Sequence, residues 1–196
     1  MRLAEEFGFR IQTLQHGVEA YKIASELKKS GVAAVVWSDW GAFKLEAYDA
    51  TSYNARLLME AGVVTSLHSD NAEISTRMNW EAGKLLRSGV DEILALSTVT
   101  NQSAKAIAID SKVGSLEAGK DADFVIWSGN PLSQFTKAEQ TWVDGRKYFS
   151  LDEDKVLRED IAKQRAQLLQ AVLAAGVTET PAAGPARGRG GEGARK

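Results

Sequence analysis

The amino-acid sequence predicts an α/β protein in which a parallel sheet with helices is followed by a small β subdomain and a long C-terminal helix. In the first third of the chain, short apolar runs alternate with segments of helical periodicity, as in βα units. From Val113 onward, glycines and Pro131 separate short β-type runs. Residues 152–175 carry apolar side chains at helical spacing, with acids in the first turn.

Three strand and helix units are predicted in succession. The strands are residues 10–14, 32–37 and 63–67. The helix after the first strand has apolar residues at helical spacing and ends at Gly31, where a C′ glycine is expected. Trp40, Phe43 and Tyr48 lie in an aromatic loop that could form a substrate wall or cover the site by packing.

Further helices are predicted after the third strand, one through Met78 and Leu85, one at residues 91–96, and one with Thr100 as its N-cap. In the β subdomain, strands are predicted at residues 123–127 and 140–143. A hairpin is expected at the Asp144-Gly145 pair.

Composition excludes several classes of protein. The chain has 196 residues, 44% of them hydrophobic, and a net charge of −2, which gives no indication of nucleic-acid binding. No apolar run reaches the roughly 18 to 20 residues of a spanning helix, so no membrane is expected, and the compartment is left open. Residues 177–196 should be a disordered tail, although their arginines could suggest RNA contact. With no cysteine and two histidines, a metal would need His, Asp or Glu ligands.

Polar residues follow two of the predicted strands at the position where barrel enzymes place catalytic groups, and Glu19 lies one turn beyond the first of them. Asp70 could accept a proton, or it could be a turn or N-cap residue. His16 could point into the same mouth, or it could be a satisfied structural histidine. Glu19 could orient the His16 imidazole, or it could interact with the helix dipole.

Several segments together resemble the amidohydrolases related to imidazolonepropionase. They are residues 14–22 (LQHGVEAYK), 67–70 (LHSD), 79–84 (NWEAGK), 100–101 and 113–127 (VGSLEAGKDADFVIW). The resemblance covers roughly residues 3–150. It implies strands six to eight of a (β/α)8 TIM-type barrel in residues 1–112, a β-sandwich segment in residues 113–150, and then a C-terminal helix in residues 151–176.

The resemblance also implies the chemistry. Members of this family bind one or two divalent cations, usually zinc, in the barrel mouth, and a metal-activated water attacks an amide, lactam or related C–N bond. By this resemblance, Asp70 would be a metal ligand and proton acceptor, and His16 a second-metal ligand or a hydrogen-bonding residue. His68 would line the pocket and contact substrate, although it could also serve packing. A small amide or dipeptide is the expected substrate class.

The family's first-strand His-x-His pair and its fourth- and fifth-strand ligands have no counterpart in this sequence. We therefore expect an incomplete C-terminal piece that needs the missing N-terminal half or another copy of the chain. One alternative is a catalytically inactive α/β module retained for association. Another is a binding subdomain, formed by the β region and the long helix, beside a degenerate barrel remnant.

Overall fold

The computed structural model describes residues 1–41 and 44–176 of the chain. The chain divides into two compact units, Met1–Leu151 and Asp152–Lys196. The predicted disorder of residues 177–196 and the prediction for Phe43 lie outside the described residues. Within the described residues, no helix is both long enough and apolar enough to cross a membrane.

The first unit opens with alternating helices and strands. These elements are α1 (Arg2–Phe7), β1 (Thr13–Leu14), η1 (Ala20–Ile23), α2 (Ala24–Ser30), β2 (Ala33–Val36), η2 (Leu45–Ala47), α3 (Asn54–Glu60) and β3 (Thr65–Leu67). Helix α2 ends at Gly31, whose backbone has a φ of 67°. This is the left-handed conformation that glycine adopts without a steric penalty, so the predicted helix end is confirmed.

The three strands form one parallel sheet in the order β1-β2-β3, as the alternating pattern predicts. In the register, Leu14 lies beside Ala34, and Val36 lies beside Leu67. The strands are shorter than the predicted ranges, and β1 is the shortest of the three. Because the strands are parallel, their carboxyl ends meet at one edge of the sheet, which brings together the residues that follow them.

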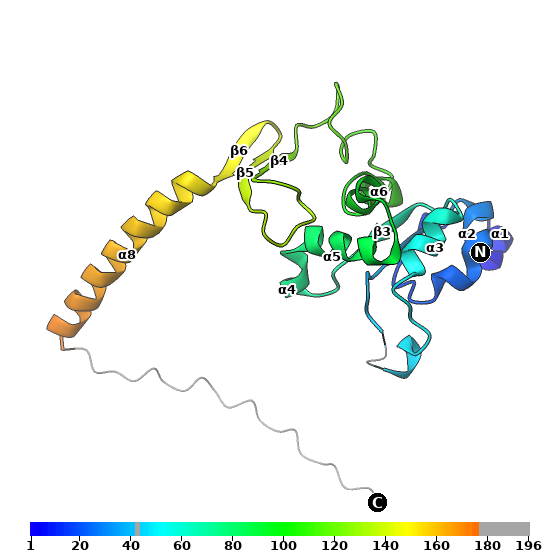
Figure 1. Cartoon of the computed structure of the whole chain (residues 1–196), viewed down its shortest axis with the longest axis horizontal. Helices are drawn as coiled ribbons and strands as arrows, with labels where there is room; N and C mark the ends of the chain where they lie inside the picture. The colour runs from blue at the N-terminus through cyan, green and yellow to red at the C-terminus, as the bar shows by residue number, and fades with distance from the viewer. Residues whose placement is uncertain (42–43, 177–196) are drawn as a thin grey trace, which may run out of the picture. The chain divides into compact units, whose positions relative to one another are not determined.

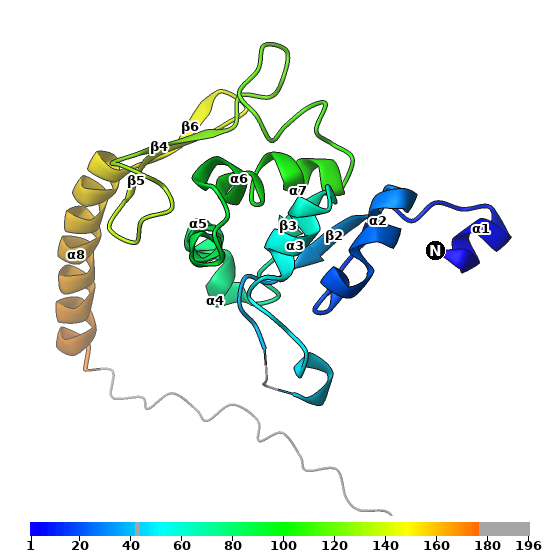
Figure 2. The ribbon, with the colours of Figure 1, turned by 45° about the vertical axis from the view of Figure 1, so that its right-hand side comes forward.

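The two faces of this sheet pack against different helices (Figure 2). Ala34 and Val36 point to one face and pack with Leu27 of α2 and Leu58 of α3 in the main core. Ala33 and Val35 point to the other face and pack with Ala106. Both faces of β2 are therefore buried, which explains its uninterrupted apolar sequence.

Helices then follow β3. They are α4 (Ala72–Ser75), α5 (Met78–Lys84), η3 (Leu85–Ser88), α6 (Glu92–Ser97) and α7 (Asn101–Ala106). The last turn of α7 lies beside the start of β1, because the side-chain amide of Gln12 donates to the carbonyl of Lys105 at 3.3 Å and the Thr13 hydroxyl donates to the carbonyl of Ala106. Thr100 is the N-cap residue of α7, as predicted, but its side chain forms no capping hydrogen bond, because its hydroxyl donates to the carbonyl of Leu96 in the preceding helix at 3.1 Å.

A second, antiparallel sheet closes the first unit. It contains β4 (Phe124–Trp127), β5 (Ala138–Val143) and β6 (Arg146–Ser150) in that order (Figure 1). Strands β5 and β6 are joined by Asp144 and Gly145, with φ angles of 50° and 70°. Two successive residues with positive φ form the turn that best matches the strand twist of a hairpin, so the predicted hairpin is confirmed.

The second unit is described through α8 (Leu151–Ala174), which begins at the last residue of the first unit and is the long C-terminal helix that the sequence predicts (Figure 1). Its first turn contains Asp152, Glu153 and Asp154, where acids interact favourably with the helix dipole. Gly176, two residues past its end, has a φ of 66°.

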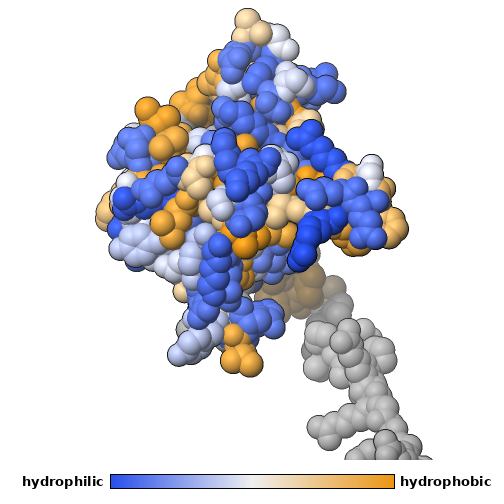
Figure 3. Space-filling model, turned by 90° about the vertical axis from the view of Figure 1, so that its right-hand side faces the viewer, coloured by the Kyte–Doolittle hydropathy of each residue, from blue (hydrophilic) through white to orange (hydrophobic). Residues whose placement is uncertain are grey.

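Large apolar side chains are exposed at the N-terminal end of the first unit. Leu3 and Phe7 of α1 and the following Phe9 are all exposed. Figure 3 views the molecule from the side that carries this end and shows apolar residues scattered among hydrophilic ones. Together with β1, which pairs only with β2, these residues leave this side of the sheet without a packing partner in the described structure.

Candidate functional site

Three aromatic or imidazole side chains and one carboxylate meet at the carboxyl ends of the parallel strands. His16 follows β1, Trp37 follows β2, and His68 and Asp70 follow β3. The Nε2 atom of His16 lies 4.0 Å from Oδ1 of Asp70, and both side chains are about half exposed. The structure therefore brings together the three site residues that the sequence singled out.

The backbone at His16 and Asp70 is unusual, because φ is 55° at His16 and 47° at Asp70. Residues other than glycine rarely adopt positive φ, and where they do, the surrounding structure has to hold them there. Asn71 helps to do so after Asp70, because its side chain accepts hydrogen bonds from the amides of Glu73 and Ile74 and caps α4. The chain turns sharply at both residues, directly beyond the strand ends.

Asn54 of α3 holds the loop that follows His16. Its side-chain amide donates to the carbonyls of Gly17 at 2.8 Å and Val18 at 3.0 Å, and its oxygen accepts from the amide of Tyr21 at 3.0 Å. Asn54 is 3% exposed, so these bonds satisfy a polar group that would otherwise be buried without partners. A buried amide thereby fixes the backbone next to a candidate metal ligand.

Glycine is required at position 17. A Cβ atom there would lie 2.9 Å from the Cβ of Ala20 and 3.5 Å from a methyl group of Val36. This close approach allows the amide of Gly17 to donate to the carbonyl of Val35 at 3.1 Å. The residue after His16 is thereby bound to the central strand of the sheet.

The aromatic rings form a stacked cluster. The Trp37 ring stacks on His16 with centroids 5.5 Å apart at 11°, and it contacts His68 at 4.4 Å and 39°. Trp40 stacks on Trp37 at 5.3 Å and 3°, and the two imidazoles are 5.1 Å apart. These separations suit offset aromatic contacts.

His68 is held in a less polar environment than His16. Burial, chiefly, and then the neighbouring His16 lower the pKa of His68 below its usual value, while Asp70 opposes the shift. Its Nε2 atom is buried and has no hydrogen-bond partner within the described residues. A neutral imidazole is therefore favoured at this position near neutral pH.

A cavity of about 690 Å³ opens beside these groups. Within the part of the chain that is described, its wall includes His16, Trp37 and Asp70 but not His68. Glu19 and Lys22 also contribute to the wall, where they form an ion pair at 2.8 Å. The carboxylate of Glu19 is therefore engaged by an ammonium group, which does not support its interpretation as the orienting partner of His16.

Sequence reasoning missed a buried carboxylate that supports the loop after β2. Glu81 of α5 accepts a hydrogen bond from the hydroxyl of Ser38 at 2.6 Å and forms an ion pair with Lys84 at 2.9 Å. Lys84 also binds Asp39 at 3.0 Å. Although burial opposes the shift, the hydrogen bonds to Glu81 and Asp39 raise the pKa of Lys84. The available signal was position, because Glu81 falls on the apolar stripe of its helix with Met78 and Leu85.

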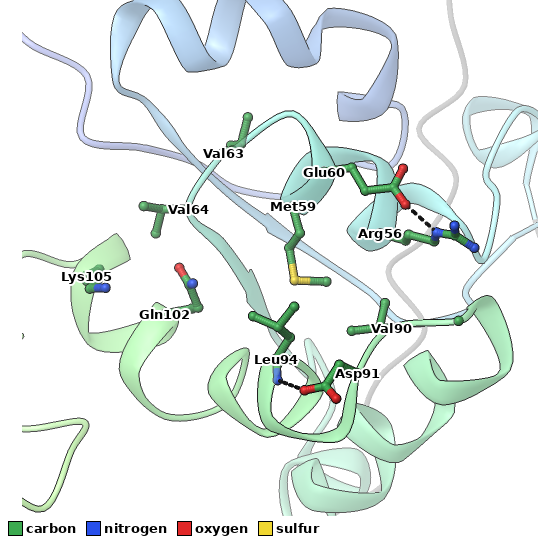
Figure 4. Close-up of a pocket in the computed structure, with 12 residues that line it drawn as sticks. Arg56, Met59, Glu60, Val63, Val64, Val90, Asp91, Leu94, Gln102 and Lys105 are labelled. Atoms are coloured by element: carbon green, nitrogen blue, oxygen red, sulfur yellow. Dashed lines mark hydrogen bonds and ion pairs between the residues drawn. The ribbon is translucent and has the colours of Figure 1, made fainter.

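A second cavity, of about 400 Å³, lies at the opposite ends of the strands, where Val63 and Val64 precede β3 (Figure 4). Met59 and Leu94 supply further apolar wall, and Gln102 projects toward Val64. Barrel enzymes place catalytic groups at the carboxyl ends of their strands. This cavity is therefore separate from the candidate site.

His16 and Asp70 fit as part of a metal site. Bonds of about 2.0–2.2 Å to a tetrahedral zinc place two ligand atoms about 3.4 Å apart, so a small rotation of these half-exposed side chains would close the present 4.0 Å to that separation. Across residues 1–41 and 44–176, however, no group of three or more His, Cys, Asp or Glu side chains could hold a metal ion. A complete catalytic zinc site uses three protein ligands, so at least one would come from outside the described residues.

Comparisons with known proteins agree on one family. The chain is 35% identical to an amidohydrolase from Thermotoga maritima MSB8, with a TM-score of 0.71, over 76% of this chain and 39% of that one. It is 28% identical to the amidohydrolase tasK of Hapsidospora irregularis over 74% of this chain and 15% of that protein. It thus spans well under half the length of these relatives.

A zinc-bound adenosine deaminase from Xanthomonas campestris is similar in fold, with a TM-score of 0.56 and 16% identity, over 87% of this chain and 46% of that one. The model of the Amidohydrolase family matches residues 10–147, which include every candidate site residue. This match extends over well more than half of the sequence, and the chain therefore belongs to the amidohydrolase family.

Proposed function

We propose that this chain is part of a metal-dependent hydrolase that cleaves C–N bonds in amides, lactams or peptide-like substrates. The observation that carries the proposal is the approach of His16 and Asp70 to 4.0 Å at the carboxyl ends of parallel strands, in a member of the amidohydrolase family. The zinc named for the related adenosine deaminase supports zinc as the ion to test first. Residues 1–112 would be the last part of a (β/α)8 barrel, and residues 113–150 a β-sandwich segment.

Each residue has a distinct role in this proposal. When bound, a divalent metal lowers the pKa of its water to about 7, which makes hydroxide available at neutral pH. The carboxylate of Asp70 would accept the proton of the attacking water and later deliver it to the leaving nitrogen. His16 would bind a second metal or act as a hydrogen-bonding group. His68 does not line the cavity within the described residues, so we assign it no substrate contact.

The described ligands are too few for a tight site, which is why we propose that the chain functions with a partner. That partner would be an N-terminal barrel half or another copy of the chain. Strand β1 supports this proposal, because within the described residues it pairs only with β2, and unpaired strand edges favour pairing with another chain.

The test is Asp70→Asn in the complemented form, in which this chain is mixed with an N-terminal half taken from a related enzyme. Asn cannot accept the proton, and loss of general acid/base catalysis alone removes about 10² to 10⁴ in rate. We expect kcat to fall by at least that factor with an unchanged circular dichroism spectrum. Near-normal turnover of the variant would contradict the role of Asp70.

A catalytically inactive association module is the second candidate function. It is favoured by the absence of any three-ligand group among the described residues. Such a module would bind the N-terminal half but hydrolyse no amide when complemented, so the same assay separates the two proposals.

A further inference from the structure

We propose that Trp37 is a positioning residue that holds the His16 and His68 imidazoles in one stacked arrangement beside Asp70, and that Glu81 fixes Trp37 through Ser38. The importance of this arrangement for hydrolysis rests on the proposed function. The stacked arrangement itself is independent of it.

Trp37 is the ring that both imidazoles share. It stacks nearly parallel on His16, with centroids 5.5 Å apart, and lies 4.4 Å from His68. The two imidazoles follow the outer strands β1 and β3, whereas Trp37 follows β2, the strand between them. One indole can therefore set the orientation of both rings, and through His16 it also influences the 4.0 Å approach to Asp70.

The indole is oriented by packing. Its Nε1–H group is buried and has no hydrogen-bond partner within residues 1–41 and 44–176. Its orientation therefore depends on the rings around it and on the backbone that follows it. Trp40 covers it with a nearly parallel ring at 5.3 Å.

The backbone after Trp37 is anchored to α5. Ser38 is 4% exposed and donates to the carboxylate of Glu81, which is 5% exposed, at 2.6 Å. Lys84 neutralises Glu81 at 2.9 Å and reaches Asp39 at 3.0 Å. A buried, charge-assisted hydrogen bond is short and directional, so it fixes Ser38 and thereby the backbone of the adjacent Trp37, from which the indole projects.

This arrangement resembles the outer support that metal sites require. Groups behind the ligands orient the imidazoles, and their removal typically costs about 10- to 100-fold in metal affinity or activity. Hydrogen bonds usually supply this support. Here the Trp37 ring, stacked on the candidate ligand His16, would supply it.

The chain contains two histidines, so its two imidazoles can be assigned by NMR from His16→Gln and His68→Gln. In the wild-type chain we expect nuclear Overhauser contacts between the Trp37 indole and both imidazoles. Trp37→Leu should abolish these contacts and shift both imidazole signals, because aromatic ring currents displace nearby proton signals. Trp37→Phe should leave both imidazole signals closer to their wild-type positions than Trp37→Leu does, since it retains an aromatic face.

Glu81→Gln keeps the side-chain shape but removes the charge, so it should move both imidazole signals in the same direction as Trp37→Leu, by less. The matched control is Trp142→Leu, which removes an indole stacked on Phe124 in the antiparallel sheet, 5.5 Å between centroids. The control should leave both imidazole signals in place. Equal shifts from the control, or no Trp37 contact in the wild-type chain, would overturn the proposal.

Titration with Zn²⁺ alone, followed by the same two signals, separates this inference from the proposed function. Trp37→Leu should weaken the apparent zinc affinity about tenfold, and Trp37→Phe by less. If zinc leaves the wild-type imidazole signals unperturbed, the proposed metal role is wrong. The nuclear Overhauser contacts would still show whether Trp37 stacks on the two imidazoles. Unchanged zinc affinity in Trp37→Leu would overturn the positioning role.

Discussion

At the scale of single residues, the candidate site depends on backbone conformations that few residues adopt. His16 and Asp70 both have positive φ, and Asp and His are among the residues that tolerate it best. Strained backbone of this kind persists only where the surrounding structure holds it in place, and it is often found at functional sites. The two side chains that carry the proposed chemistry are thus also the ones at which the backbone turns.

His16→Ala tests the imidazole in the complemented protein. The side chain is about half exposed, so its removal should cost little stability, while zinc content or turnover should fall. Metal analysis together with thermal unfolding measures both effects. A large drop in melting temperature at unchanged metal stoichiometry would instead identify a structural histidine.

His68 should make stability depend on pH. Burial first, and then His16, lower its pKa from the usual 6.5, so the folded chain resists a proton that the unfolded chain accepts. The stability contributed by neutral His68 is therefore complete above pH 6.5 and is lost as pH falls below it. We expect the melting temperature of wild type to fall more between pH 7 and 5 than that of His68→Gln. Parallel pH profiles would contradict this expectation.

Trp37 shows what the sequence could not predict at this scale. The sequence placed it as the last residue of the second predicted strand, whereas in the structure it follows β2. For the aromatic loop beyond it, substrate wall and packing were equally open interpretations. Ring stacking depends on side-chain orientations that no spacing rule encodes. The approach of His16 and Asp70 could be anticipated, because parallel strands bring their carboxyl ends to one edge.

At the scale of elements, the order of strands and helices was predictable and their ends were less so. Gly31 and the Asp144-Gly145 hairpin were identified correctly because positive φ restricts which residues fit. Thr100 was assigned a cap that its hydroxyl does not form, since the carbonyl of Leu96 competes for it. A threonine hydroxyl can bond the backbone of the preceding helix or of the following one, so its position in the sequence does not define which helix end it caps.

Asn54 connects α3 to the loop of His16, and its replacement tests how that loop is held. Asn54→Ala would leave the carbonyl of Val18 without its donor and the amide of Tyr21 without its acceptor, while the carbonyl of Gly17 would keep the amide of Ala20 at 3.1 Å. An unsatisfied buried polar group costs about 1–3 kcal/mol, so the free energy of unfolding should fall by at least that much. Asn54→Asp keeps the acceptor for the amide of Tyr21 but loses both donations, and it should be at least as damaging. Urea unfolding measures both variants, and changes below about 0.5 kcal/mol would show that the loop is held otherwise.

At the scale of the whole molecule, the proposed function requires strands and metal ligands beyond those described. Three parallel strands are described, whereas a closed barrel of this type needs eight. The exposed Leu3, Phe7 and Phe9 lie at the end of the unit that carries β1. Exposed apolar surface of this kind favours association with another chain.

Size-exclusion chromatography with metal analysis and an amidase assay, on the chain alone and on its complemented form, tests the central claim most directly. We expect the chain alone to elute as associated species with less than one zinc per chain and no amide cleavage. The complemented form should bind zinc and cleave an amide. A monodisperse monomer of the chain alone that holds stoichiometric zinc and hydrolyses an amide would contradict the account.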